Sequence, residues 1–435
     1  MRHREAMVRD KERLAMTTLS GPIARRLPAA IAGSFLATAL IASSAGLALA
    51  GEGPSSEASP IAPPMFGFDK FKLRGRLQVD FGQIGAPSAL DDPALGTFTT
   101  IRRARLGAEG EKDGFGFVLE VDFAGNDVSV EDGFAYWDNG TFRIAVGNLK
   151  PKVSMEEETD DLFSPFLERA AFTSAFEFEY TIGAAASMHG ENYSLHAGLQ
   201  STRSLNHSAA SDGYIPSFRA TFSPKLAGGR LHLAASTRYR KKPTEDGRVH
   251  YRREPQIHNT DIAFVDTGDL GVRSDLFLGV ETGAFFGPFY VTGEWGSLKA
   301  RLSEQPRSKA DFGGGYLGAG YILTGESYPY DPRSGTTGRI VPDRPLASGG
   351  PGAFAINLRF DFLELNDVAL GIDGGKQGAV MTGITWIPHA NARLLATYSR
   401  LRVNGGPFAA AANAGNPART RFGSNVFGLR AQIDW

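Results

Sequence analysis

Charged and apolar side chains alternate along many short segments of this sequence, beginning with "DKFKLRGRLQVDF" from Asp69 to Phe81. The basic residues of this run occupy every second position: Lys70, Lys72, Arg74 and Arg76. Apolar residues or glycine lie between them. Successive side chains of a β-strand point to opposite faces. The run therefore predicts a strand with one cationic face and one apolar face.

The same alternation recurs in "FGFVLEVDFAG" (115–125), "TFRIAVGNLK" (141–150), "ENYSLHAGLQ" (191–200) and "SNVFGLRAQIDW" (424–435). A soluble β-sandwich also alternates, with its charged face in solvent. Charged faces turned inward are costly in a dry core but are stable around water. An outer-membrane barrel has lipid outside and a polar lumen inside, and it must close because backbone groups in lipid have to pair. We therefore expect an all-β transmembrane antiparallel barrel.

The composition argues against several other classes of protein. The 435 residues contain no cysteine, which excludes disulfides, thiolate metal sites and a thiol nucleophile. The sequence has no H-E-x-x-H or G-x-S-x-G motif. The match to G-x-G-x-x-G at 313–318 continues as a strand rather than opening a helix. We expect no enzyme activity, no cofactor and no metal, and the mildly acidic mature chain argues against nucleic acid.

The N-terminal segment predicts export. Arg25 and Arg26 precede an uncharged run that ends in Ala48-Leu49-Ala50, a small-x-small cleavage pattern. A permanent helical anchor is the alternative, and an internal Met is an alternative start. We expect a signal peptide at 1–50 cleaved between Ala50 and Gly51, a flexible Pro/Ser-rich lead-in at 51–66, and the barrel at 67–435.

The order and spacing of longer blocks resemble a known family, the phosphate-selective porins O and P of Gram-negative outer membranes. These blocks are "TTIRRARLGAEG" (99–110), "VGNLKPKVSMEEETDDLFSPFLERAAF" (146–172), "FVDTGDL" (264–270), "GAFFGPFYVTGEW" (283–295), "YILTGESYPYDPRSGTTGRIVPDRPL" (321–346), "LRFDFLELND" (358–367) and the closing "FGLRAQIDW" (427–435). The resemblance implies about sixteen strands, an inward-folded third loop and three barrels per assembly. The mature length agrees, because roughly 24 residues per strand and connection exceed the ~10 that a tilted strand needs.

The resemblance also implies arginines through the lumen and lysines near its constriction. By position, the candidate pore-lining and anion-binding residues are Lys70, Lys72, Arg74, Arg76, Arg103, Arg105, Lys150, Lys152, Arg169, Arg238 and Arg240. For any one of them, a rim charge or a partner for a lumen carboxylate is the alternative. Arg102 is out of phase, which predicts a bulge or an interface.

The expected third loop contains a dense acidic run, Glu156, Glu157, Glu158, Asp160 and Asp161. These carboxylates would repel anions if they faced the constriction. They would instead fix the loop if they paired with wall arginines such as Arg103 and Arg105, which is the role we favour. Ser154 and Glu157 fit a capping box, so a short helix is expected to begin here.

The expected function is an outer-membrane porin passing small inorganic anions, such as phosphate or polyphosphate-like solutes. Cationic rings concentrate counter-ions, and an arginine fork fits phosphate oxygens. A general or cation-tolerant porin, or a plugged barrel acting as a surface-binding scaffold, remains an alternative. The expected partners are outer-membrane lipid, two further copies of the chain and the barrel-assembly machinery, for which the terminal Trp435 resembles the recognition signal.

Overall fold

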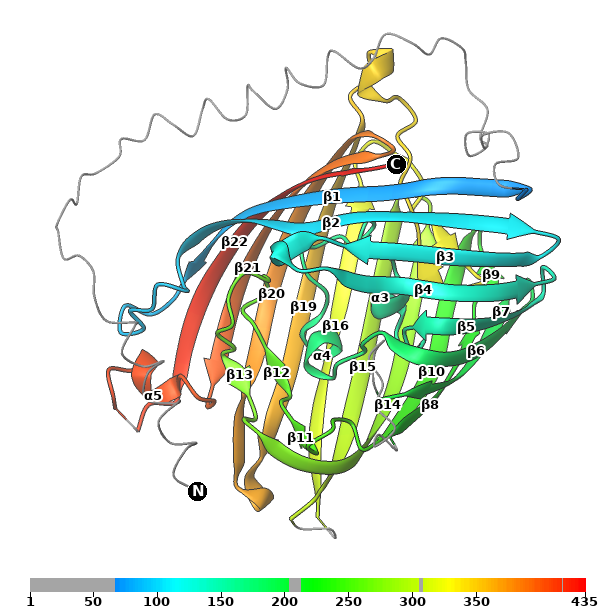
Figure 1. Cartoon of the computed structure of the whole chain (residues 1–435). Helices are drawn as coiled ribbons and strands as arrows, with labels where there is room; N and C mark the ends of the chain where they lie inside the picture. Colours follow the sequence, from blue (N-terminus) through cyan, green and yellow to red (C-terminus); the bar gives the residue numbers. More distant parts are fainter. Residues whose placement is uncertain (1–66, 203–212, 305–307, 417) are drawn as a thin grey trace, which may run out of the picture. The chain divides into compact units, whose positions relative to one another are not determined.

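The computed structural model describes residues 67–202, 213–304, 308–416 and 418–435. These residues form a closed antiparallel barrel of sixteen strands, which confirms the predicted fold class (Figure 1). The barrel closes where the first strand pairs with the last, from Arg76 opposite Asp434 to Gly85 opposite Asn425. The predicted signal peptide, its cleavage site at Ala48 and Ala50, and the lead-in lie outside the described residues.

The first eight barrel strands are β1 (Lys70–Gly85), β2 (Thr97–Lys112), β3 (Phe115–Asp122), β4 (Ser129–Asp138), β5 (Phe142–Leu149), β6 (Thr181–His189), β7 (Tyr193–Ser201) and β8 (Tyr214–Phe222). The other eight are β10 (Gly229–Lys241), β14 (Leu270–Phe286), β15 (Phe289–Leu302), β16 (Lys309–Ile322), β19 (Ala353–Asp367), β20 (Ile372–His389), β21 (Ala392–Asn404) and β22 (Arg421–Asp434). The barrel is therefore uneven, because β3 to β8 are shorter than β14 to β22.

The alternation of β1 becomes an inner and an outer face. Leu73 and Phe81 are exposed on the outer wall, whereas Arg76 and Asp80 are buried inside the barrel. A register shift against β2 leaves Arg102 without a partner opposite it. This bulge agrees with the out-of-phase position of Arg102 in the sequence.

The connections differ between the two ends of the barrel. The end that holds the start of β1 and the end of β22 has short turns, such as 113–114, 139–141 and 287–288. The opposite end has long loops, such as 150–180, 242–269 and 405–420. Short turns lie on the periplasmic side of outer-membrane barrels and longer loops outside. The connection 323–352 between β16 and β19 is an exception, because it is long and lies at the end with the short turns.

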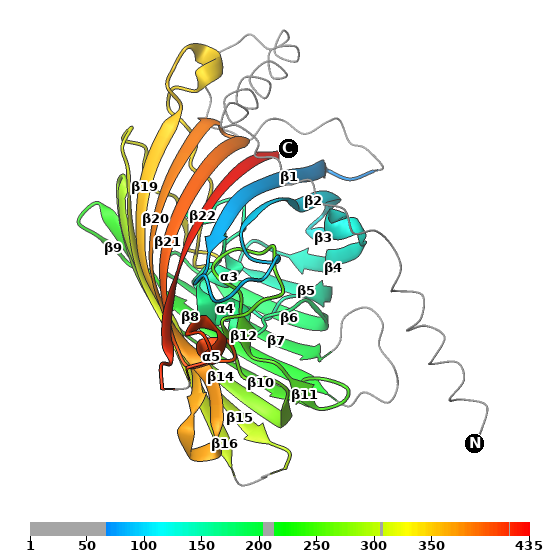
Figure 2. The ribbon, with the colours of Figure 1, turned by 90° about the vertical axis from the view of Figure 1, so that its left-hand side faces the viewer.

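The third loop, 150–180, folds into the barrel between β5 and β6, as predicted (Figure 2). It carries α3 (Met155–Glu158) and α4 (Ala171–Ala175). Helix α3 begins at the predicted cap, where the Ser154 hydroxyl accepts a hydrogen bond from the Glu157 backbone N–H at 3.2 Å. Phe172 of α4 stacks on Phe277 of β14, with ring centroids 6.4 Å apart. Aromatic packing therefore holds the loop against the inner wall.

Two further connections contain buried residues. The loop 242–269 carries β11 (Arg248–Val249), β12 (Arg252–Arg253) and β13 (Val265–Asp266), and Tyr251 and Phe264 are fully buried. The connection 323–352 carries β17 (Tyr330–Asp331), β18 (Thr336–Thr337) and η2 (Leu346–Ser348). The remaining short elements are β9 (Lys225–Leu226), η1 (Ala124–Asn126), η3 (Val368–Leu370) and α5 (Ala409–Ala412). No helix in the described part of the chain has the length and apolarity to span a membrane.

Candidate functional site

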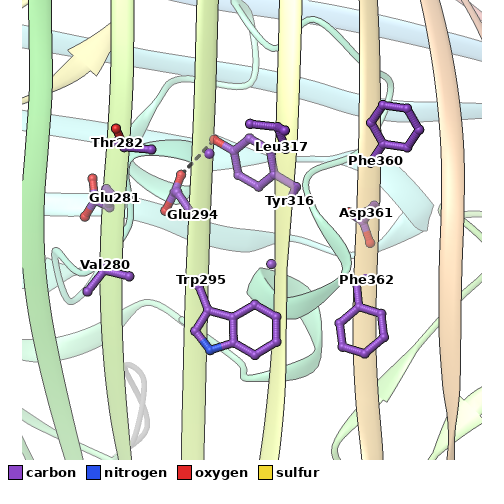
Figure 3. Close-up of a pocket in the computed structure, with 12 residues that line it drawn as sticks. Val280, Glu281, Thr282, Glu294, Trp295, Tyr316, Leu317, Phe360, Asp361 and Phe362 are labelled. Atoms are coloured by element: carbon purple, nitrogen blue, oxygen red, sulfur yellow. Dashed lines mark hydrogen bonds between the residues drawn. The ribbon is translucent and has the colours of Figure 1, made fainter.

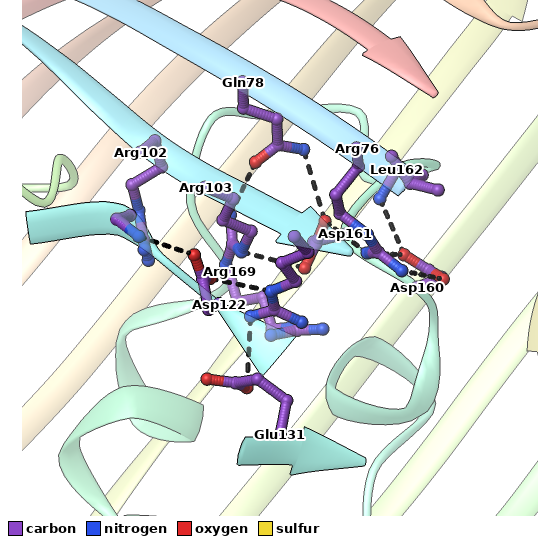
Figure 4. A network of polar contacts seen from close by, with 12 residues as sticks. Arg76, Gln78, Arg102, Arg103, Asp122, Glu131, Asp160, Asp161, Leu162 and Arg169 are labelled. Carbon is purple, nitrogen blue, oxygen red and sulfur yellow. Dashed lines mark hydrogen bonds and ion pairs between the residues drawn. The ribbon is translucent and has the colours of Figure 1, made fainter. Parts of the chain in front are cut away.

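The inner wall of β1 meets the acidic end of the third loop (Figure 4). The Arg76 guanidinium donates to Asp160 at 2.7 Å and to Asp161 at 3.0 Å, and a second nitrogen donates to Glu120 of β3 at 3.0 Å. Arg103 of β2 contacts Asp161 from the other side at 2.9 Å. The two loop carboxylates are thus held by two wall arginines, in the arrangement that we favoured for this run.

Arg105, the next inward residue of β2, has different partners. It contacts Glu120 at 3.0 Å, Asp122 at 2.8 Å and Glu131 at 3.1 Å. These carboxylates belong to β3 and β4, and among the residues described Arg105 forms no ion pair with the third loop. Its pairs instead connect three neighbouring strands.

Two carboxyl groups of the third loop that are largely shielded from solvent have shifted pKa values. Burial alone would raise the pKa of Asp161, but the guanidiniums of Arg103, Arg76 and Arg105 outweigh it and hold that pKa well below its usual range. Burial also opposes ionisation of Glu168, whose pKa is held well below its usual range chiefly by Arg102. Both groups are therefore anionic at neutral pH and remain paired.

The glutamates of α3 form ion pairs both with the barrel wall and within the third loop itself. Glu156 reaches across to Arg359 of β19 at 2.7 Å. Glu157 and Glu158 instead bind Lys150 and Lys152 at the entrance of the same loop, each at 2.5 Å. The structure therefore places these two predicted pore lysines in ion pairs within the loop.

Other predicted cations contact backbone carbonyl groups of the third loop. Arg169 donates to the carbonyls of Glu156 and Thr159 at 3.0 and 2.9 Å. Arg238 of β10 donates to the carbonyls of Phe176 and Glu177 at 2.9 and 2.6 Å. Each of these guanidiniums therefore supplies hydrogen-bond donors to backbone oxygens of the loop.

The remaining predicted cations of the wall lie at β10 and at the start of β1. Arg240 pairs with Asp275 of β14 at 2.6 Å. Lys70 is exposed and pairs with Glu111 at 2.9 Å, and Arg74 contacts Glu109 at 3.4 Å. Lys72 is exposed and lines a cavity of about 200 Å³, together with Arg74, Arg76, Arg339, Asp160 and Asp434. This cavity lies at the periplasmic end and holds both signs of charge.

Several lumen residues were not singled out from the sequence. Arg219 pairs with Glu281 at 2.6 Å, and Arg430 pairs with Asp80 at 2.7 Å. Arg393 donates to the carbonyl groups of Leu162 and Ser164. All three arginines stand at inward positions of alternating runs, so the strand period was a signal that could have identified them.

Cations of β1, β2, β10, β19, β21 and β22 thus contact the third loop from several sides of the lumen. Most of their charge is balanced by carboxylates at contact distance. A closed membrane barrel with a charged interior, narrowed by a loop folded into it, defines an outer-membrane porin.

Comparison with known proteins identifies the family. The sequence model of the phosphate-selective porins O and P matches residues 71–432, and the chain belongs to this family. A Caulobacter vibrioides protein of uncharacterized function is 35% identical over 378 residues, covering 84% of this chain and 74% of that protein. These similarities describe a channel rather than an enzyme.

Solved porins share the fold at low sequence identity. The anion-selective porin from Comamonas acidovorans superimposes with a TM-score of 0.52 at 11% identity, covering 84% of this chain and 99% of its own. The in-vitro folded, trimeric OmpT of Vibrio cholerae gives a TM-score of 0.52 at 12% identity, covering 84% and 99%. At these identities the likeness concerns the fold.

Proposed function

We propose that this outer-membrane porin passes small hydrophilic solutes with a modest preference for anions. The observation that carries the proposal is that two of its basic residues have no carboxylate at contact distance among the described residues. Lys72 at the mouth and Arg393 in the lumen carry no ion pair among the described residues, so their charge is not cancelled by contact. The name of the family and the inward basic positions of β1 support the same preference.

The preference is expected to be weak because the guanidinium groups that could bind a phosphate are already paired with carboxylates. Arg430 donates two parallel hydrogen bonds to Asp80, and Arg219 does the same to Glu281. Phosphate would have to displace these carboxylates to bind in a bidentate way. This pairing also favours a second candidate function, a porin without charge preference.

Reversal potentials across a planar bilayer under a salt gradient test the proposal. We expect wild-type protein to favour anions, and the double change Lys72→Gln with Arg74→Gln to reduce that preference, more at low salt than at high salt because screening is weaker there. Lys225→Gln, which alters an exposed turn away from the lumen, is the matched control. A wild-type channel that favours cations would contradict the proposal, and one without preference would establish the second candidate.

We also infer export and assembly. The signal peptide is proposed to be removed after Ala50, so sequencing of protein from the outer-membrane fraction should begin at Gly51. Three copies are proposed to assemble, supported by the trimeric form of OmpT, which shares the fold. Crosslinking or native mass spectrometry that finds only monomers would contradict the trimer without affecting the pore.

A further inference from the structure

The outer wall over β14, β15, β16 and β19 contains an apolar hollow of about 540 Å³ (Figure 3). Two rows of laterally paired outward residues form it. One row runs Val280, Trp295, Gly315 and Phe362, and the other runs Thr282, Gly293, Leu317 and Phe360. Each row contains a glycine: Gly315 lies between Trp295 and Phe362, and Gly293 lies between Thr282 and Leu317. The Trp295 and Phe362 rings, on either side of Gly315, are stacked with centroids 6.0 Å apart, while Glu281, Glu294 and Asp361 point to the opposite, inner side.

The hollow lies near the middle of the membrane. On the outer face of β15, Trp295 stands six residues from Phe289 at the periplasmic end and six from Arg301 at the extracellular end. Six residues span roughly 20 Å along a strand, or about 15 Å along the membrane normal at the usual tilt. That is about half of the hydrocarbon thickness. Any ligand of the hollow at this depth is therefore an acyl chain or another apolar group.

A basic cluster lies on the same outer wall at the extracellular boundary. Arg273, Arg301 and Lys309 are exposed there on three adjacent strands. Arg301 and Lys309 are direct register partners, an arrangement of like charges that destabilises a sheet unless an anion lies between them. In the described part of the chain, none of the three forms an ion pair, whereas the neighbouring Lys299 pairs with Asp311. The cluster is therefore positively charged without being neutralised by ion pairs within the described part of the protein, as expected of a site that binds an anion.

We propose that this surface binds a phosphorylated glycolipid of the outer leaflet. An acyl chain fills the hollow, and a phosphate group lies between Arg301 and Lys309 with Arg273 beside it. The separation of the two parts along the strands matches a molecule whose headgroup is at the boundary and whose tail reaches the bilayer centre. The cluster stands at the end that bears the long loops, so the occupant comes from the outer leaflet. The site faces lipid, and it does not depend on which solutes cross the lumen.

Binding of bisphosphorylated lipid A to the detergent-solubilised full-length porin, followed by native mass spectrometry, tests this site. Arg301→Gln with Lys309→Gln is expected to weaken binding roughly 25-fold, since each basic residue at a membrane surface contributes a factor of about five. Val280→Trp fills the hollow from an exposed position and is also expected to weaken binding. Arg402→Gln with Arg421→Gln removes two exposed cations from β21 and β22, away from the hollow, and is the matched control.

The outcomes separate the alternatives. Loss of lipid A in both test variants but not in the control, with unchanged single-channel conductance showing intact barrels, is the expected result. Equal loss in the control would reduce the cluster to general surface charge and overturn the site. Equally strong, cluster-dependent binding of phosphatidylglycerol would overturn the glycolipid assignment. A change of oligomeric state in Val280→Trp would show instead that the hollow contacts a second copy of the chain.

Discussion

Asp161 is the residue where wall and loop depend most directly on each other. Its side chain is only 10% exposed, and it accepts contacts from Arg76 and Arg103, which belong to two neighbouring strands. Each guanidinium would be a buried charge with fewer partners if this carboxylate were lost. A buried ion pair adds little stability compared with an apolar pair, but breaking it from one side is costly. The role of Asp161 is therefore to fix the position of the loop.

We expect Asp161→Asn to reduce the free energy of unfolding in detergent by about 3 kcal/mol, because it leaves two buried guanidiniums with one fewer counter-charge. Chemical denaturation followed by tryptophan fluorescence measures this change. Glu191→Gln makes the same chemical change in an exposed pair with Lys225 and should have little effect. Similar losses in the two variants would contradict the role of Asp161.

The same residue gives a pH dependence. The folded pKa of Asp161 lies below its unfolded value of about 4, so its contribution is fully present above the unfolded pKa and is lost as pH falls through the folded pKa. Proteolysis within 150–180 should therefore be unchanged from pH 7 to pH 5. It should increase only in stronger acid, below about pH 4. An increase already at pH 6 would point to another titrating group.

Among the elements, the connection 323–352 is notable because it contacts both the inner wall of the barrel and the third loop. The carbonyls of Ser334 and Gly335, between β17 and β18, accept hydrogen bonds from the buried Arg219 at 2.7 and 2.8 Å. The segment also reaches the third loop, where the Thr337 backbone N–H lies 3.3 Å from the Thr159 hydroxyl. Segments entering from opposite ends of the barrel therefore meet, and each restricts the movement of the other.

A pair of glycines tests this docking. Gly335 has φ +66°, and an added Cβ would lie 2.8 Å from Thr221 and 3.3 Å from Arg219. Gly349 in the same segment has φ +75° but open space around its Cβ position. Both alanine variants carry the cost of left-handed backbone, about 1–2 kcal/mol. Only Gly335→Ala should also displace the β17–β18 segment from Arg219, which would appear as noisier and larger single-channel currents. Equal currents in the two variants would contradict this contact.

In the whole molecule, the predictable part of the fold is the part that follows from strand period. Alternation placed Arg76 inside and Leu73 outside because a strand has a side-chain period of two. It could not show that Arg76 meets Asp161, 85 residues away, because that contact depends on how an irregular loop folds. The long connection 323–352 was missed for a similar reason. Its Gly and Pro residues indicate a loop, but they do not indicate that the loop turns into the barrel.

Closure of the barrel gives the final prediction, because it depends on both ends of the chain. Gly75 and Trp435 exchange two backbone hydrogen bonds, at 3.0 and 3.2 Å, and the indole covers Gly75 so closely that a Cβ there would lie 2.0 Å from the ring. We expect Gly75→Val and Trp435→Ala each to lower the fraction of chain that migrates as folded barrel in unheated gel electrophoresis.

Gly378→Val is the matched control for this closure, because Gly378 is an outward strand glycine with nothing within 4 Å of its Cβ position. It should assemble almost normally. Removing the ring relieves the clash, so the combined Gly75→Val and Trp435→Ala variant should lose less than the two single losses together. Additive losses, or an equal loss in Gly378→Val, would show that the indole and Gly75 do not act as one contact in closing the barrel.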